Sequence, residues 1–241
     1  MPSADPAAQR LLLDLAELDQ AADAAAHRRA SLPELKVIAE GATRIDDLSG
    51  RLVLAQAEVG DLDRAGRKLD DEIDAVRARS ARDQDRLISG AVPAKELENL
   101  QSEVESLARR QATLEDEALE LMERRETADA AMARAQAELD AAMTEVDRAS
   151  TSRDEQFADI DAELADLSGR RTALTAGIPQ DLLALYERIR GSGKVAAGAL
   201  TGDRCGACRM GLDRQSLEEI RTAAPDSVQR CPECGAILVR G

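Results

Sequence analysis

Small and apolar side chains recur at alternating steps of three and four residues along most of this chain. The spacing holds over residues 11–25, 48–76 and 97–146. It places these side chains on one side of an α-helix, which is typical of a coiled coil. The chain has one Phe, one Tyr and no Trp, so it lacks the bulky aromatic residues of an ordinary globular core. We therefore expect a mainly α-helical protein in which long helices pair along their apolar sides.

A short break near residues 89–93 separates the two longer stretches. Gly90 can leave a helix with a positive φ, and Pro93 suits the first position of the next helix. Two long helices joined by so short a turn pack antiparallel. The chain is therefore predicted to form a helical hairpin with an exposed tip at this break.

A second break is expected near residues 31–33, because Pro33 removes a backbone donor and ends or kinks the first helix. If the hairpin turns about residue 91, position 33 lies opposite roughly residue 149. Near that point the apolar spacing of the returning helix contains an extra four-residue step, which locally unwinds a supercoil. The residues that carry this change of phase are Arg153, Phe157, Ile160 and Leu164. The first helix is therefore predicted to pair with residues 155–175.

Two Cys-x-x-Cys pairs close the chain and contain its only cysteines: Cys205 with Cys208, and Cys231 with Cys234. Each pair aims two thiolates at one point, and the 22 residues between the pairs suit a small ribbon that completes a tetrahedral site. We expect one structural Zn²⁺ per chain. Four cysteines close the coordination shell, so a catalytic zinc is not expected. Redox-active thiols are an alternative, but the surrounding pattern of a thioredoxin-like protein is missing.

The residues around the cysteines predict a small module. Glycines beside the cysteines let backbone amides donate hydrogen bonds to the sulfurs. The expected elements are a helix over 181–190, a joint at 191–193, a strand over 194–200, a helix over 214–223 capped by Asp213, and a strand over 236–239. The chain is thus predicted to consist of a coiled-coil hairpin (1–176), a short helix with its joint (177–193) and a zinc ribbon (194–241).

The net charge of −15 is unevenly distributed along the chain. Residues 194–241 carry seven Lys/Arg and six Asp/Glu, which leaves +1, so the helical part carries −16. An acidic hairpin repels a polyphosphate, so a contact with nucleic acid is expected on the ribbon. The residues expected to make it are Arg188, Arg190, Lys194, Arg204, Arg209 and Arg230. These cations can instead offset the −2 charge of Zn²⁺ with four thiolates, and only Tyr186 is available to stack on a base.

The sequence also bears on location and enzyme class. No stretch of 18 apolar residues is present, and the first five residues lack the features of a signal peptide. Unexported Cys-x-x-Cys pairs favour metal binding over disulfides, so we expect a cytoplasmic protein. The chain has no phosphate-binding glycine loop and no nucleophile–base pair, and its only histidine, His27, lies off the apolar side of the first helix. An enzyme is not expected.

The chain resembles the bacterial C4-type zinc-ribbon proteins in which a coiled-coil hairpin precedes the ribbon. The resemblance covers nearly the whole chain and is carried by residues 93–104, by 178–190 with its Tyr-Glu-Arg-Ile-Arg run, by both cysteine pairs and by Ile237 and Leu238. It implies a kinked antiparallel hairpin, one zinc ion and a nucleic-acid-binding role for the ribbon. Some relatives are implicated in flagellar or secretion-system assembly through a sigma factor, export components or messenger RNA. Ala236 departs from the pattern, since relatives often carry arginine there.

The function favoured by these observations is a non-enzymatic zinc-binding adaptor or regulatory protein, whose coiled coil and ribbon bind protein partners. Binding of RNA or DNA through the basic residues of the ribbon is the alternative. The identity of a partner and the choice between monomer and dimer stay open, because the apolar sides can be satisfied within one hairpin or between two chains.

Overall fold

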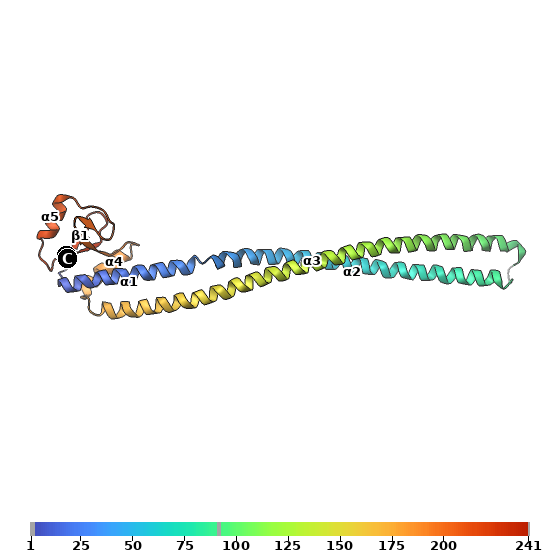
Figure 1. The fold of residues 1–241 in the computed structure, drawn as a ribbon, viewed down its shortest axis with the longest axis horizontal. Helices are drawn as coiled ribbons and strands as arrows, with labels where there is room; N and C mark the ends of the chain where they lie inside the picture. The colour runs from blue at the N-terminus through green and yellow to red at the C-terminus, as the bar shows by residue number, and fades with distance from the viewer. Residues whose placement is uncertain (1–2, 91–92, 241) are drawn as a thin grey trace. The chain divides into compact units, whose positions relative to one another are not determined.

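The computed structural model describes residues 3–90 and 93–240, and the predicted tip residues 91 and 92 lie outside this part (Figure 1). The chain has two compact units, one formed by Met1–Leu35 with Thr151–Gly241 and the other by Lys36–Ser150. The helices are α1 (Pro6–Ala30), α2 (Pro33–Ile88), α3 (Ala94–Thr175), α4 (Gln180–Arg190) and α5 (Arg214–Thr222). The strands are β1 (Ala197–Thr201), β2 (Arg204–Cys205), β3 (Gln229–Arg230) and β4 (Ile237–Val239). The predicted fold class, a kinked helical hairpin followed by a small four-cysteine ribbon, is confirmed.

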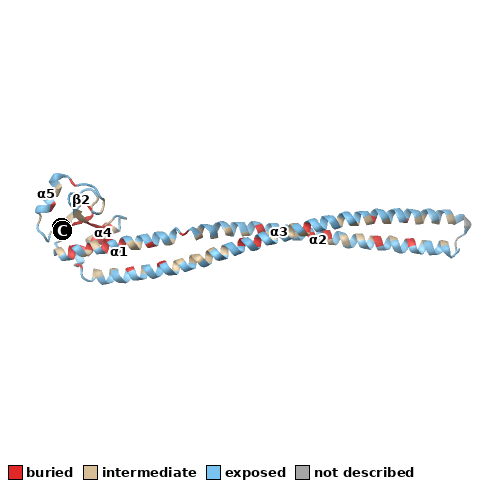
Figure 2. Ribbon diagram, viewed as in Figure 1, coloured by how far each residue is buried: buried red, intermediate tan, exposed pale blue. Residues whose placement is uncertain are grey.

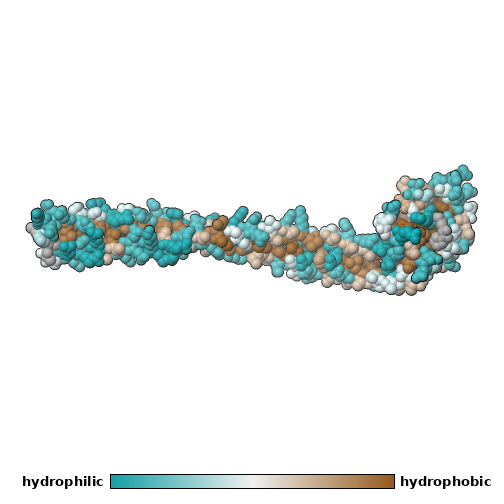
Figure 3. Space-filling view, turned by 180° about the vertical axis from the view of Figure 1, so that it is seen from behind, coloured by the Kyte–Doolittle hydropathy of each residue, from teal (hydrophilic) through white to brown (hydrophobic). Residues whose placement is uncertain are grey.

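Within the unit Lys36–Ser150, α2 and α3 pair antiparallel along the predicted apolar sides. Leu48 and Leu52 of α2 pack with Leu139 and Ala142 of α3. Buried residues recur at intervals along each helix, while most other positions are exposed (Figure 2). On the face drawn in Figure 3, hydrophobic surface follows the helices as a stripe with hydrophilic surface beside it. Gly90 has φ +67°, as expected for the end of α2.

Ion pairs cross between the same two helices. Asp63 accepts a hydrogen bond from Arg125 at 2.5 Å, and Glu115 accepts one from Arg77 at 2.6 Å. The spacing places Arg125 on the apolar side of α3, but its side chain is exposed. Its charged guanidinium extends outward and pairs with the carboxylate of Asp63 on α2. Among the described residues, no helix combines the length and the apolar composition that crossing a bilayer requires.

In the other unit, α1 pairs with the last part of α3. Ala25 and Leu32 pack with Ile160. Arg29 pairs with Asp161 at 2.8 Å, and its guanidinium carbon lies 4.0 Å from the centre of the Phe157 ring. The predicted pairing of the first helix with residues 155–175 is therefore confirmed.

The predicted break near Pro33 is present. Helix α1 ends at Ala30, and the backbone N–H of Ser31 donates to the carbonyl of His27 at 3.0 Å. His27 is exposed, as predicted. Glu34, one residue after the proline, accepts a hydrogen bond from Ser152 at 3.1 Å. This partner lies a few residues beyond the predicted position 149.

The ribbon is a four-stranded sheet in the order β2-β1-β4-β3. Two antiparallel pairs, β1 with β2 and β3 with β4, are joined by a parallel contact of β1 with β4. The predicted short elements are present within one to three residues of their expected bounds. The largest difference is at β1, which begins at Ala197 rather than at residue 194.

The ribbon packs directly on the N-terminal helix. Leu12 and Leu15 of α1 are fully buried in one core with Leu182 of α4 and with Val228 and Ile237 of the ribbon. At the start of the chain, the backbone N–H of Ala4 donates to the carbonyl of Asp226 at 2.8 Å. The Ser3 hydroxyl donates to the Asp226 carboxylate at 2.6 Å. The sequence did not predict this docking.

Two glycines of α2 provide a matched test of the helix packing. A Cβ at exposed Gly50 meets nothing within 4 Å, whereas one at Gly41 lies 2.3 Å from Cγ2 of Val146. We expect Gly50→Ala to stabilise the hairpin by about 0.5–1 kcal/mol through helix propensity. Gly41→Ala should lose this gain, because Val146 must move. Thermal unfolding followed by far-UV circular dichroism measures both, and equal stabilisation by the two changes would contradict the close approach.

Candidate metal centre

The first cysteine pair lies on a tight backbone turn after β2. The N–H of Arg209 donates to the carbonyl of Cys205 at 2.8 Å, and the N–H of Cys205 donates to the carbonyl of Met210 at 3.0 Å. Arg209 has φ +62°, a left-handed conformation that disfavours a side chain with a Cβ. The turn points the sulfurs of Cys205 and Cys208 toward the sulfurs of the second cysteine pair.

The second pair repeats this arrangement. The N–H of Gly235 donates to the carbonyl of Cys231 at 2.9 Å, and the N–H of Cys231 donates to the carbonyl of Ala236 at 2.8 Å. Gly235, with φ +79°, occupies the position that Arg209 occupies in the first turn. The two turns therefore share one hydrogen-bond pattern.

The four sulfurs converge on one point. All four lie within 4.8 Å of one another. The sulfur atoms of Cys205 and Cys234 are 3.9 Å apart, as are those of Cys208 and Cys231. A tetrahedral zinc site with Zn–S bonds of about 2.3 Å needs sulfur–sulfur distances of about 3.8 Å. The donor set and its spacing therefore fit one Zn²⁺, as the sequence predicts.

The surroundings of the sulfurs set their affinity for protons. Burial raises the pKa of Cys205 and raises the pKa of Cys234 to about 12. A hydrogen bond from the Met210 backbone amide lowers the pKa of Cys208. Other backbone amides, those of Ala207 and Ala236 among them, also donate to sulfur, as the sequence predicts. Because zinc binds thiolates, it must displace the protons that remain, and its affinity falls as the pH falls.

The metal centre forms part of a small hydrophobic cluster. Cys205 and Cys231 are buried with Leu212, with Ile220 of α5 and with Leu238 of β4. Asp213 accepts hydrogen bonds from two backbone amides at the start of α5, as predicted for its cap. This cluster alone is too small to stabilise the module, so a zinc ion bound by the four cysteines would add to the stability that the core shared with α1 provides.

A close backbone contact holds β1 against the first cysteine turn. The N–H of Gly206 donates to the carbonyl of Ala199 at 2.8 Å. A Cβ built on Gly198 would lie 2.4 Å from the backbone nitrogen of Ala207. Position 198 therefore requires a glycine. The sequence shows a glycine within the expected strand, but it does not show the close contact that requires it.

Arg240 organises the loop after α5, a role that sequence reasoning missed. Its guanidinium donates hydrogen bonds to the carbonyl oxygens of Ile220, Ala223, Ala224, Pro225 and Ser227 at 2.7–3.2 Å. The loop carries the residues that bind the start of the chain. A lone arginine after the last strand gave no signal of this role.

A buried carboxylate holds α4 against α1 and was also missed. Asp19 accepts hydrogen bonds from the Tyr186 hydroxyl at 2.8 Å and from Nε of Arg171 at 2.8 Å, and it pairs with Arg190 at 3.1 Å. Glu187 pairs with Arg171. Burial and the neighbouring carboxylate raise the pKa of Tyr186. The Tyr-Glu-Arg-Ile-Arg run was the available signal, since three of its five side chains join this network or its ion pairs.

The six basic residues proposed for nucleic acid have different surroundings. Arg190 pairs with Asp19 and with Asp23, and Arg230 donates to the carbonyl of Gly235 at 2.8 Å. The other four are exposed, and their side chains have no hydrogen bond or ion pair within the described residues: Arg188, Lys194, Arg204 and Arg209. The structure thus brings the four cysteines together, but it places the cations on α4, directly after the joint, on β2, on the first cysteine turn and on β3.

Ala236, where relatives often carry arginine, is fully buried beside the second cysteine turn. Its methyl group has no contact with solvent, so in this chain the position has a packing role.

A closed four-cysteine site on a ribbon that follows a helical hairpin defines a class of zinc-ribbon proteins. Two family descriptions match this chain: the CT398-like coiled coil hairpin domain over residues 15–194 and the C4-type zinc ribbon domain over residues 204–238. The chain therefore belongs to the CT398-like coiled-coil hairpin family and carries its C4-type zinc ribbon.

Relatives and solved structures agree with this assignment. The chain is 43% identical to an uncharacterized protein of Mycobacterium tuberculosis over 97% of its own length and 96% of the relative. A structure from Mycobacterium smegmatis is 40% identical and superposes with a TM-score of 0.85, covering 99% of this chain and 100% of the other. CT398 from Chlamydia trachomatis is 17% identical, with a TM-score of 0.55 over 98% and 95% of the two chains, and shares the fold.

The contact at Gly198 predicts an effect on metal binding. Gly198→Ala should weaken zinc affinity by about tenfold or more, because its Cβ displaces the first cysteine turn, which carries two of the four sulfurs. Gly211→Ala is the matched control, since a Cβ there meets nothing within 4 Å. Competition with a chromogenic chelator measures both affinities, and similar values for the two variants would contradict a role for this contact.

The buried carboxylate predicts an effect on stability. Asp19→Asn removes the buried charge that Arg171 and Arg190 share and should cost about 2–3 kcal/mol of unfolding free energy. Asp23→Asn changes the same charge beside Arg190, but the Asp23 side chain is 73% exposed against 5% for Asp19. We expect it to change stability by less than about 0.5 kcal/mol. Urea unfolding monitored by Tyr186 fluorescence compares the two, and equal losses would contradict this assignment.

Proposed function

We propose that the protein is a non-enzymatic adaptor whose helical hairpin and zinc ribbon bind protein partners. The observation that carries the proposal is the single core that α1, α4 and the ribbon strands share. It holds α1, α4 and the ribbon in one fixed arrangement, which suits a surface that a partner recognises as a whole.

The metal centre also supports a non-enzymatic function. Four cysteines leave no open position on zinc for a substrate or an activated water. The matched family descriptions name a coiled coil and a zinc ribbon. Reduced cysteines that bind zinc are typical of cytoplasmic proteins, and we place the adaptor in that compartment.

Nucleic-acid binding through the ribbon is the second candidate. Four exposed cations without a side-chain partner among the described residues favour it: Arg188, Lys194, Arg204 and Arg209. Two observations weigh against it. Tyr186 is 1% exposed, so its ring is not available to stack on a base. With the −2 charge of a zinc tetrathiolate, the +1 of residues 194–241 becomes about −1.

Affinity capture with and without nuclease separates the two candidates. The tagged protein is used with its zinc, beside a variant in which the four exposed cations are replaced by Gln. For an adaptor, we expect the same protein partners after nuclease treatment and with the variant. Partners that disappear with nuclease, together with binding to RNA whose log affinity falls linearly with log salt, would instead support nucleic-acid binding.

A further inference from the structure

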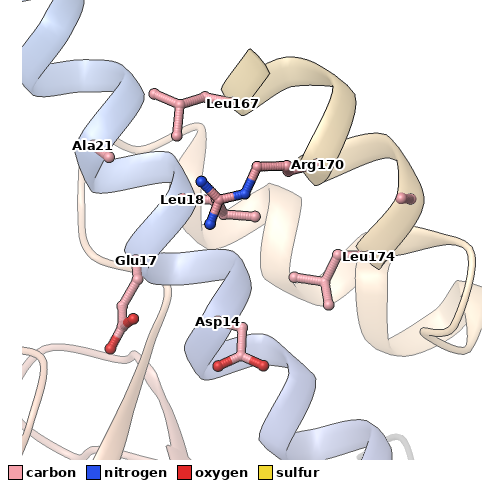
Figure 4. A pocket seen from close by; sticks show the side chains of 8 residues that line it. Asp14, Glu17, Leu18, Ala21, Leu167, Arg170 and Leu174 are labelled. Atoms are coloured by element: carbon pink, nitrogen blue, oxygen red, sulfur yellow. The ribbon is translucent and has the colours of Figure 1, made fainter. Parts of the chain in front are cut away.

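A groove of about 720 Å³ with largely apolar walls lies between α1 and α3, and none of the four cysteines lines it (Figure 4). Its walls are formed by Leu18 and Ala21 of α1 and by Leu167, Ala173 and Leu174 of α3. Figure 4 shows the leucines of both helices pointing into the space between them. Both walls belong to the same compact unit of the chain.

The groove is the length of a short stretch of helix. Its lining runs from position 14 to 21 on α1 and from 167 to 174 on α3. Seven residues of helix rise about 10 Å, which is about two turns. A helix that lies in such a groove contacts it through side chains at spacings of three and four residues.

Charged side chains border the apolar walls. Asp14 and Glu17 lie on the α1 side, and the Arg170 side chain reaches from α3 into the space between the helices. Arg170 already pairs with Asp166 of α3 at 3.6 Å. Asp14 and Glu17 are exposed, and within the part of the chain that the structure describes neither has a hydrogen bond or an ion pair. The next two acids of α1 differ, because Asp19 and Asp23 both pair with Arg190. The α1 border therefore presents two negative charges that no described side chain pairs with.

Another side of α1 is already covered. Leu12, Leu15 and Ala16 pack in the core shared with α4 and the ribbon. Asp14, Glu17 and Ala21 project from a different side of the same helix, since helical neighbours lie three and four residues apart. The groove thus remains open to solvent beside a rigidly packed region.

We propose that this groove docks one amphipathic helix of a protein partner, with apolar side chains on the leucines and Lys or Arg facing Asp14 and Glu17. The inference rests on the proposed adaptor function and names the surface and the partner chemistry. A basic helix fits because it neutralises the two acids while it covers the apolar walls. A second copy of this chain, with its net charge of −15, brings like charge to the same border.

Synthetic helices of defined sequence test the groove directly. The first probe has about 18 residues, leucines at heptad spacing and flanking lysines. The second replaces each lysine by glutamate. Fluorescence anisotropy with the full-length zinc-loaded protein measures both, and we expect binding of the lysine probe only. A benzophenone on the probe should cross-link to residues 14–21 and 167–174.

Two variants and a control make the test specific. The double variant Asp14→Lys with Glu17→Lys should weaken the lysine probe roughly tenfold, and Ala173→Arg should weaken it by placing a long side chain over the apolar wall. The control is the double variant Asp46→Lys with Asp47→Lys, which changes two exposed acids of α2. It should leave the affinity for the lysine probe unchanged. Equal losses in the control, or cross-links elsewhere, overturn the proposal.

A second copy as the occupant would appear as a dimer in sedimentation equilibrium that Ala173→Arg dissociates, and this result also overturns the proposal. A failure of the probe tests concerns the groove alone, since the nuclease-resistant partners that support the adaptor function are measured separately. Loss of those partners in the Asp14 and Glu17 double variant, but not in the Asp46 and Asp47 control, supports the groove in the complete protein.

Discussion

The ribbon strands are too short to build a core of their own, and α1 supplies the apolar side chains that they lack. Strands β2 and β3 have two residues each and β4 has three. Leu12 and Leu15 of α1 are fully buried against Ile237 and Val228 of the ribbon and Leu182 of α4. Since apolar burial is the main stabilising term in so small a region, the rest of this unit depends on that contact.

The polar contacts reinforce the same junction. Asp19 is buried with Tyr186, Arg171 and Arg190 around it, so α4 is held on α1 in one position. Arg240 fixes the loop whose Asp226 binds the first described residues of the chain. The metal centre and α1 therefore each stabilise the ribbon. Zinc joins the two cysteine turns, and α1 holds the sheet that carries them. A region built this way suits the presentation of a fixed surface to a partner.

Several local features were predictable because their causes are local. The heptad spacing identified the apolar sides of α2 and α3, Pro33 identified the break, and Gly90 identified the end of α2. The cysteine spacing identified the metal centre, since each pair needs only its own turn. Interactions between residues far apart in the sequence were not predictable from local patterns. Nothing near Asp19 indicates that Tyr186, 167 positions away, donates to it.

The sequence by itself determined that this protein is a helical hairpin with a four-cysteine zinc ribbon. Side-chain periodicity and cysteine spacing are short-range patterns that act through the geometry of one helix or one turn. Only the tertiary structure decided where the ribbon attaches, which cations are neutralised and where a groove opens between α1 and α3. These outcomes depend on which apolar sides meet after the chain folds back, and on which charges burial forces to pair.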